Sequence, residues 1–287
     1  MTGKIRTGII GGSGLYAIDG LEVIDELDIH TPWGKPSAPL LLAKLHNQEV
    51  VFLPRHGRNH DIPPHKINYR ANIYALKLAG VSRIISVSAV GSLREDIAPG
   101  DFVLVDQLID QTINREKTFF DGPVVAHVSM ADPICHCLQD TLFQASQKSG
   151  IHTHKNGTYL VMQGPQFSTR AESMLYRSWG LDVIGMTNMP EAKLAREAEM
   201  CYATIAMCTD YDCWHEEEDN VSVSSVIEVM HANVEKAHML LHHFFQQSQQ
   251  ATCACNQALE HGVFADLSKQ DDDAIRPIHA LVKRFLS

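Results

Sequence analysis

Two aspartates near residue 210 are the strongest candidates for acid chemistry in this chain. Asp210 and Asp212 follow an apolar run at 202–208, which predicts a buried strand. Residues two apart in a strand face the same side, so the two carboxylates can converge, whereas a frayed strand end would leave them in a solvated turn. Where two partly buried acids converge, the pKa of one rises, and that acid stays protonated as a hydrogen-bond donor or general acid.

Three loops that follow predicted strands carry groups that can bind an anion. The first, 11–14, has three glycines, so it exposes consecutive backbone N–H groups beside the Ser13 hydroxyl. In the second, the Arg55 guanidinium can hold an oxyanion with two hydrogen bonds, next to the His56 imidazole. The third, 86–92, ends a strand with small hydroxyl residues. Each loop alone could be purely structural, but together they predict one anion site, because open α/β sheets bind ligands at strand ends.

Two other kinds of site are less compatible with the spacing. Gly12, Gly14 and Ala17 fit the GxGxxA dinucleotide fingerprint, but Gly20 interrupts the crossover helix that this fingerprint requires. The histidines of 56–65 could ligate a metal ion, but the fixed charge of Arg55 opposes a dication there. We therefore expect neither a dinucleotide nor a metal ion at these loops.

The seven cysteines include no CxxC pair of the kind that builds a zinc site. Their odd number, in a chain that shows no secretory segment, indicates reduced thiols and a cytoplasmic protein. Cys253 and Cys255 form a CxC in a polar tail, where they are either two ordinary thiols or a redox clip.

Composition argues against two classes of partner. The 287 residues include 24 Lys+Arg and 34 Asp+Glu, a formal net charge of −10, whereas a nonspecific nucleic-acid binder needs a basic face. No stretch approaches the roughly 18 uninterrupted apolar residues of a membrane span. Because 45% of the residues are hydrophobic, the chain can bury a large core. We expect a globular protein that binds neither nucleic acid nor membrane.

Alternating strand and helix patterns must position the candidate loops. Apolar runs of strand length lie at 6–10, 39–45, 50–53, 83–90, 102–105, 158–162, 182–186 and 202–208. Helical patterns lie at 69–79, 169–178, 190–200 and from about 222 to 244. Several strands are apolar throughout, which is typical of a sheet covered on both faces, so the predicted class is α/β. After 246 the chain is polar and aperiodic until a short amphipathic helix predicted at 274–285.

An anion site beside an acid of raised pKa suits displacement at a sugar carbon. Bound phosphate is then the nucleophile, and the acid protonates the leaving group. The phosphate dianion also stabilises an oxocarbenium-like transition state. The spacing identifies neither the sugar nor the base.

Eight segments, taken in order along the chain, resemble one family. They are GIIGGSGL (8–15), TPWGKPS (31–37), RHGRNH (55–60), NYRANI (68–73), GSLRE (91–95), GPQFSTRAES (164–173), MTNMPE (186–191) and TDYDCW (209–214). The chain resembles the S-methyl-5'-thioadenosine phosphorylase family over about residues 5 to 245. This resemblance implies a purine nucleoside phosphorylase-like α/β fold over 1–245, with a central mixed twisted sheet flanked by helices. Residues 246–287 would be a C-terminal extension with a short terminal helix.

The resemblance also implies an activity. Members of the family cleave methylthioadenosine with phosphate to adenine and 5-methylthioribose 1-phosphate, usually as homotrimers, without a metal or organic cofactor. The expected partners are therefore a small nucleoside, phosphate and further copies of the chain. Two alternatives stay open: a 6-oxopurine or methylthioinosine nucleoside phosphorylase, and a non-catalytic nucleotide-binding protein on the same fold.

Residue roles carry over by position from the resemblance. For phosphate binding it implies Ser13, Arg55, His56, Ser88, Ala89 and Thr187. For the nucleoside it implies Phe167 and Ser168 along the purine, Met186 under the ribose, Asp210 and Asp212 at the base edge, His60, Val223 and Val226 near the 5' group, and His127 lent by a neighbouring subunit. Asp210 would be the catalytic acid.

Overall fold

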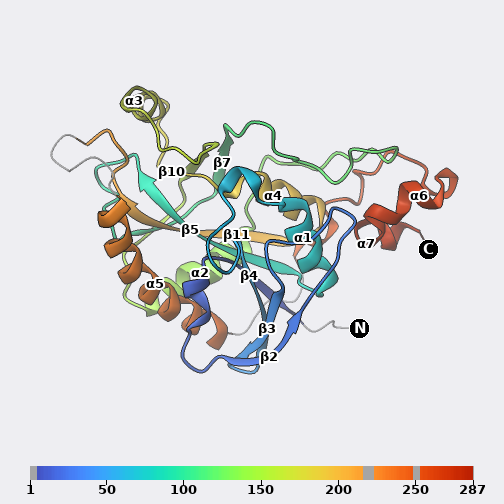
Figure 1. The fold of residues 1–287 in the computed structure, drawn as a ribbon, viewed down its shortest axis with the longest axis horizontal. Coiled ribbons are helices and arrows are strands. Elements are labelled where there is room, and N and C mark those ends of the chain that lie inside the picture. The colour runs from blue at the N-terminus through green and yellow to red at the C-terminus, as the bar shows by residue number, and fades with distance from the viewer. Residues whose placement is uncertain (1–4, 216–222, 248–252, 287) are drawn as a thin grey trace.

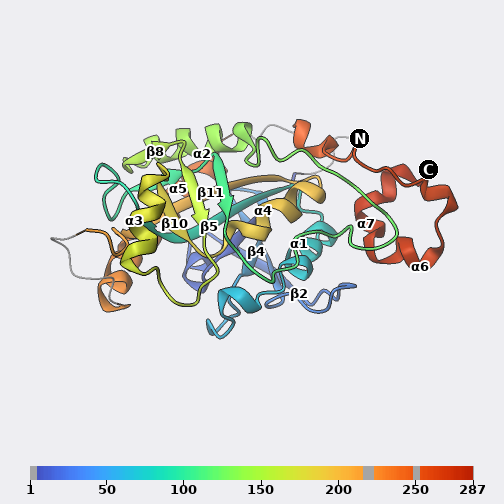
Figure 2. The same cartoon turned by 90° about the horizontal axis from the view of Figure 1, so that it is seen from above.

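A twisted mixed sheet of eleven strands forms the centre of the protein, with helices on both faces (Figures 1 and 2). The computed structural model describes residues 5–215, 223–247 and 253–286. Helices α2 (His136–Lys148) and α5 (Val223–Gln246) pack together on one face, and α1 (Tyr69–Leu78) and α4 (Asn188–Glu197) pack together on the other. The expected α/β class, with a central mixed sheet flanked by helices, is confirmed.

The sheet contains both parallel and antiparallel strand pairs. Their bounds are β1 Thr7–Gly11, β2 Glu22–Leu27, β3 Leu40–Leu45, β4 Gln48–Pro54, β5 Arg83–Ser92, β6 Phe102–Leu104, β7 Gln107–Asp110, β8 Thr153–Lys155, β9 Thr158–Val161, β10 Val183–Gly185 and β11 Cys201–Asp210. The main order is β2-β3-β4-β1-β5-β10-β9-β7, and β11, β6 and β8 continue from β5. All eight predicted strands are present, while β2, β7 and β8 were not expected.

Strand β5 pairs with three other strands: β11 along one edge, and β1 and β10 along the other. Along one edge it pairs with β11 from Arg83 to Gly91. Along the other edge it pairs in parallel with β1 only as far as Ser86, and antiparallel with β10 only at Gly91 and Ser92. Within the described residues, 87–90 therefore have no strand partner on that second edge. This interruption leaves room for a ligand beside the backbone of β5.

Side-chain caps start two of the predicted helices. Asn68 caps α1 by accepting a hydrogen bond from the Ala71 N–H, and Thr169 with Glu172 makes a capping box at α3 (Arg170–Ser178). Helix α2 was not expected. The helix predicted at 274–285 is instead divided into α6 (Asp272–Ile275), a 3₁₀ turn that contains Pro277, and α7 (His279–Val282). Proline lacks the N–H that a continuous helix needs there.

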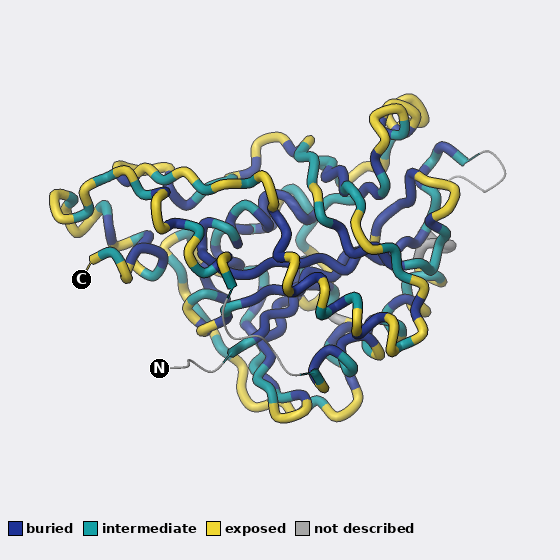
Figure 3. Tube along the Cα trace, turned by 180° about the vertical axis from the view of Figure 1, so that it is seen from behind, coloured by how far each residue is buried: buried dark blue, intermediate teal, exposed yellow. Residues whose placement is uncertain are grey.

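The core lies in the sheet and under its covering helices, where Figure 3 shows buried chain through the centre and exposed chain at the periphery. Strands β5 and β11 are buried along almost their whole length, which explains their apolar sequences. Among the described helices, none is long and apolar enough to cross a bilayer.

Candidate active site

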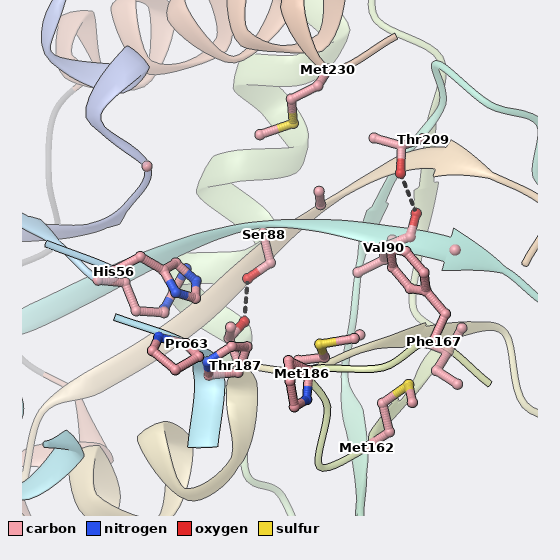
Figure 4. A pocket seen from close by; sticks show the side chains of 18 of the residues that line it. His56, Pro63, Ser88, Val90, Met162, Phe167, Met186, Thr187, Thr209 and Met230 are labelled. Atoms are coloured by element: carbon pink, nitrogen blue, oxygen red, sulfur yellow. Dashed lines mark hydrogen bonds between the residues drawn. The ribbon is translucent and has the colours of Figure 1, made fainter. Parts of the chain in front are cut away.

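A cavity of about 560 Å³ opens at the interruption of the sheet beside β5. Most of the side chains expected at a substrate site lie in its wall: Arg55, His56, His60, Ser88, Ala89, Phe167, Met186, Thr187, Asp210 and Asp212. They come from the ends of β4, β5, β10 and β11 and from the loops that follow. In Figure 4, His56, Ser88 and Thr187 lie toward one end of the cavity, and Thr209 and Phe167 lie toward the other.

Five expected residues are placed differently or not described. The Ser168 hydroxyl lies 3.8 Å from the Met162 Sδ and is not part of the described wall. His127 is exposed on the connection between β7 and α2, which runs to the C-terminal segment (Figure 1), so this copy's His127 does not reach its own cavity. The side chains of Ser13, Val223 and Val226 lie outside the described residues. Gly12 and Met230, from the same two segments, do line the cavity.

Arg55 is a buried structural cation as well as a wall residue. Its guanidinium makes two hydrogen bonds to Glu191, from Nε (2.9 Å) and Nη2 (3.1 Å), and both side chains are almost fully buried. Nη1 donates to the Val87 carbonyl at 3.0 Å, and Nη2 also donates to the Ser86 hydroxyl at 2.6 Å. A guanidinium has five N–H groups. Within the described residues, only the second N–H of Nη1 remains for an anion in the cavity.

His56 is held as a neutral imidazole. Its Nδ1 lies 2.8 Å from the Ile62 carbonyl, which can only accept, so Nδ1 carries the proton and Nε2 keeps its lone pair. Burial, helped by the nearby Arg55 charge, lowers the pKa of His56 to about 4. Its ring stacks on His60, with centroids 4.6 Å apart. At neutral pH, His56 therefore offers Nε2 as an acceptor for a protonated ligand oxygen.

This pKa predicts a stability change in mild acid. Unfolded His56 takes up a proton below its ordinary pKa of 6.5, whereas folded His56 resists protonation down to about pH 4. The free energy of unfolding should therefore fall as the pH drops through this window, with His56 contributing up to about 1.4 kcal/mol per pH unit. Urea unfolding at pH 7 and pH 5 measures it. His56→Asn should reduce the change in the free energy of unfolding between pH 7 and pH 5. The control His279→Asn, at an exposed histidine, should leave this change as it is in the parent protein. If the two variants show the same change, His56 is not its cause.

Two hydroxyls line the cavity beside His56. Ser88 Oγ and Thr187 Oγ1 lie 2.9 Å apart, with the Ser88 residue on β5 and Thr187 at the N-terminus of α4 (Figure 4). Ala89 follows Ser88 within the unpaired stretch of β5 and is exposed. Hydroxyls, a free strand edge and an imidazole are suitable ligands for the oxygens of a tetrahedral anion.

Asp210, the last residue of β11, and Asp212, in the turn that follows it, both lie in the wall of the cavity; they come together through this turn and not as two residues of one strand. Burial raises the pKa of both carboxyls, and for Asp212 the charge of Asp210 adds to the rise. Asp210 accepts hydrogen bonds from the Thr209 hydroxyl (2.7 Å) and the Asp212 backbone N–H (2.8 Å). The buried Oδ2 of Asp212 has no hydrogen-bond partner among the described residues. The pair can therefore hold one proton and present it to a ligand.

Several wall residues were missed by the sequence analysis. The structure adds Ile62, Pro63, Val90, Met162, Ile184 and Met230 to the wall, and it adds Glu191 as the partner of Arg55. These apolar side chains carry no signal that separates them from core residues. Gly91 belongs to the 86–92 segment that the sequence analysis singled out, and the structure shows why it is glycine: a Cβ there would lie 2.9 Å from Asp210 Oδ1 and 3.2 Å from Ile184. Only glycine lets the two aspartates approach β5 this closely.

The chain is similar to known proteins over most of its length. A family model described as the phosphorylase superfamily matches residues 6–246. The S-methyl-5'-thioadenosine phosphorylase of Geobacter sulfurreducens is 51% identical over 261 residues, covering 90% of this chain and 91% of that protein. The same-named protein of Thermofilum pendens is 53% identical, covering 91% and 99% respectively.

Solved structures give the same relationship. A methylthioadenosine phosphorylase from an antarctic soil metagenomic library has a TM-score of 0.90 at 44% identity, covering 96% of this chain and 98% of that one. A mutant adenosine/methylthioadenosine phosphorylase from Schistosoma mansoni, solved with adenine, has a TM-score of 0.85 at 37% identity, covering 91% and 99%. With this fold, this cavity and these relatives, the chain belongs to the S-methyl-5'-thioadenosine phosphorylase family within the phosphorylase superfamily.

Proposed function

We propose that this enzyme cleaves S-methyl-5'-thioadenosine with phosphate to give adenine and 5-methylthioribose 1-phosphate. The observation that carries the proposal is a single cavity with hydroxyls and a neutral imidazole at one end and a buried pair of aspartates at the other. A nucleophile and a leaving group on opposite sides of one sugar carbon need this arrangement. The cavity volume, about 560 Å³, is within the range of ligand sites that hold small molecules of this size.

Phosphate is assigned to the end formed by His56, Ser88 and Thr187, with the Ala89 backbone and the Ser13 loop completing it. His56 Nε2 accepts from a protonated phosphate oxygen. Ser88 and Thr187 are hydrogen-bonded to each other, so one of the two hydroxyls uses its O–H within the pair and the other donates to a second phosphate oxygen. The remaining Nη1 N–H of Arg55 adds one charge-assisted hydrogen bond. Held in this way, a phosphate oxygen faces the anomeric carbon of the ribose.

The base is assigned to the aspartate end. A protonated Asp210 donates to N7 of adenine and accepts from the 6-amino group. As the bond between N9 and the anomeric carbon breaks, its electron pair goes to the purine, and the Asp210 proton neutralises the charge at N7. The phosphate oxygen forms the new bond to the anomeric carbon, so adenine and the sugar phosphate leave as products.

The remaining wall residues are assigned to the rest of the nucleoside. Phe167 is assigned along the purine and Met186 under the ribose. Ser168, which follows Phe167 but lies outside the described wall, is assigned to the purine as well. The 5' methylthio group is assigned to His60 and the start of α5, where Val223 and Val226 precede Met230 of the wall. A methylthio group buries apolar surface against such side chains, at about 25 cal/mol per Å².

The reaction as proposed needs no metal or organic cofactor, because phosphate is itself a co-substrate. We assign the assembled enzyme as a homotrimer in which His127 completes a neighbour's 5' pocket. Exposed apolar side chains flank His127, since Val125 is 45% and Phe264 is 72% exposed, and a subunit contact would bury them. We place the enzyme in the cytoplasm and assign it a role in the salvage of purines and of methionine.

Adenine release tests the proposal directly. The absorbance of adenine should appear from methylthioadenosine only when phosphate is present, and kcat/KM should exceed that for adenosine by about tenfold to a hundredfold. Faster cleavage of inosine or methylthioinosine would replace the proposal with the 6-oxopurine alternative. Tight nucleoside binding without turnover would instead indicate a non-catalytic binding protein.

Gly91→Ala provides a prediction about the acid pair. The new Cβ would lie 2.9 Å from Asp210 Oδ1 and 3.3 Å from Asp212 Cβ, so the carboxylates must move. Displacement of a catalytic group by about 1 Å can cost about a hundredfold in rate. We expect kcat/KM for the nucleoside to fall tenfold to a hundredfold while the phosphate KM changes little. Gly122→Ala, where a Cβ meets nothing within 4 Å, is the matched control; equal kinetics in both variants contradict the prediction.

A further inference from the structure

Four cysteines from three distant segments meet outside the active site. Cys135 precedes α2, Cys201 begins β11, and Cys253 and Cys255 lie at the start of the 3₁₀ helix Ala254–Gln257. Their four sulfur atoms all lie within 4.8 Å of one another. Three of these side chains are buried and Cys253 is partly buried. The fold therefore brings together a compact set of soft ligands.

The backbone fixes this arrangement. The Cys135 N–H donates to the Tyr202 carbonyl at 2.8 Å, which places Cys135 beside the start of β11. On the tail side, Leu259 N–H donates to the Glu199 carboxylate at 2.9 Å, and Asn256 donates to the Glu199 carbonyl at 3.1 Å. Glu199 lies two residues before Cys201. These hydrogen bonds hold the C-terminal segment, from residue 253 on, against the rest of the protein without any contact between sulfur atoms.

The distances suit one tetrahedral ion better than disulfide bonds. Zinc–sulfur bonds of about 2.3 Å place the four sulfurs of a tetrahedral site about 3.8 Å apart. Cys135 Sγ and Cys253 Sγ are 3.5 Å apart, and all seven cysteines are free. A disulfide requires two sulfurs at about 2.05 Å. The cluster therefore has the size of a Cys₄ metal site.

Charge also favours a metal–thiolate centre. One divalent ion with four thiolates carries a net charge of −2. Arg196 donates from Nη1 to Cys255 Sγ at 3.6 Å, and the buried guanidinium of Arg83 interacts with Cys201, Cys135 and Cys253. These two cations offset the two negative charges. Two neutral disulfides would give the guanidinium groups no such counter-charge.

We propose that Cys135, Cys201, Cys253 and Cys255 bind one structural Zn²⁺ that fastens the C-terminal segment to the body. Binding replaces four S–H bonds with four Zn–S bonds and releases four protons, so no oxidant is involved. Four protein ligands close the coordination sphere, as in structural rather than catalytic zinc sites. The fastened segment in turn supports the His127 region, because the His127 N–H donates to the Gly262 carbonyl at 2.8 Å and Phe264 N–H donates to the Val125 carbonyl.

Metal analysis of the purified full chain tests the proposal. Plasma mass spectrometry should find about one zinc per chain after gel filtration in metal-free buffer. Cobalt exchanged into the site should give the sulfur-to-metal charge-transfer bands of a tetrahedral thiolate centre. Cys201→Ser and Cys253→Ser should each lower zinc content by at least tenfold. Cys137→Ser, at an exposed cysteine that interacts with Cys253 but is not one of the four proposed ligands, should keep it.

Two results would overturn the proposal. One is metal-free protein whose denatured mass is lower by four hydrogen atoms until reductant is added, because this shows two disulfides. The other is metal-free protein with all cysteines titratable as thiols, because this shows an empty cluster. If the serine variants do not fold, the metal content and mass of the parent protein still decide between these outcomes. Hydrogen exchange at Leu259 and His127 gives a second readout, and it should accelerate when a chelator removes the zinc.

Discussion

Arg55→Ala is expected to lower the free energy of unfolding by about 3–5 kcal/mol and to weaken phosphate binding at least tenfold. The stability loss arises because Glu191 is fully buried and would keep its charge without the two hydrogen bonds from Arg55. Among the described residues, the Ser86 and Tyr202 hydroxyls, which lie 2.7 and 2.8 Å from Glu191 Oε1, would remain to solvate it. Urea unfolding and the phosphate KM measure the two effects.

A second variant separates structure from binding. Replacing both members of the pair, Arg55→Met with Glu191→Leu, removes the unpaired charge, and hydrophobic replacements of buried ion pairs are often neutral or stabilising. This double variant should recover much of the stability but not the phosphate KM. Arg58→Ala is the matched control: its ion pair with Glu26 is about half exposed, so its loss should cost at most about 1 kcal/mol. A stable Arg55→Ala enzyme with normal phosphate saturation would refute both roles of Arg55.

The order of elements could be predicted because the central strands are apolar throughout. β5 and β11 are covered on both faces, so nearly every residue along them had to be hydrophobic or small. β2, by contrast, is an exposed edge strand whose EVIDEL sequence mixes charged and apolar residues without alternation and without a buried face. Its pairing with β3 comes from neighbouring strands rather than from its own pattern. Such a strand cannot be distinguished from a charged loop in the sequence.

Part of the candidate site could be predicted because its polar residues lie at or near the ends of apolar strands. Asp210, His56 and Ser88 could be found as polar residues within or just after apolar runs, and the structure places all three in the wall of one cavity. The segment 86–92, expected as a loop, is the second half of β5. The sequence could not show that Arg55 makes two hydrogen bonds to the carboxylate of Glu191, 136 positions away. That pairing depends on how α4 packs against the sheet. A charged residue near an anion site can thus be mainly a structural partner of another charge.

The cysteine cluster also could not be predicted from the spacing of residues in the sequence. Metal sites are found in sequences when two ligands lie a few residues apart, as in CxxC. Here only Cys253 and Cys255 are close in sequence, and their spacing is not the usual one. Cys135 and Cys201 join them because α2 begins beside β11. A ligand set assembled by tertiary structure leaves no local pattern.

Asp210→Asn is expected to change which purine the enzyme accepts. The buried carboxyl of Asp210 has a raised pKa, so in its protonated form it can donate to N7 and accept from the 6-amino group of adenine. An asparagine amide donates to N7 and, through its second N–H, suits a 6-oxo group instead. Exchanging one hydrogen bond for one unpaired group changes transition-state binding by about 1–3 kcal/mol. We expect kcat/KM to fall about tenfold to a hundredfold on methylthioadenosine and to rise relatively on 6-oxo nucleosides.

The pH dependence identifies which aspartate carries the proton. In the parent enzyme, kcat/KM should fall as the pH rises through the raised pKa of the acid pair, because the donor proton is then lost. Asparagine does not titrate, so Asp210→Asn should lose this alkaline limb. Asp212→Asn is the matched variant: it should keep both the limb and the preference for the 6-amino base, because Asp210 still holds the proton. If Asp212→Asn removes the limb and Asp210→Asn keeps it, Asp212, whose Oδ2 is buried without a partner among the described residues, is the donor to N7.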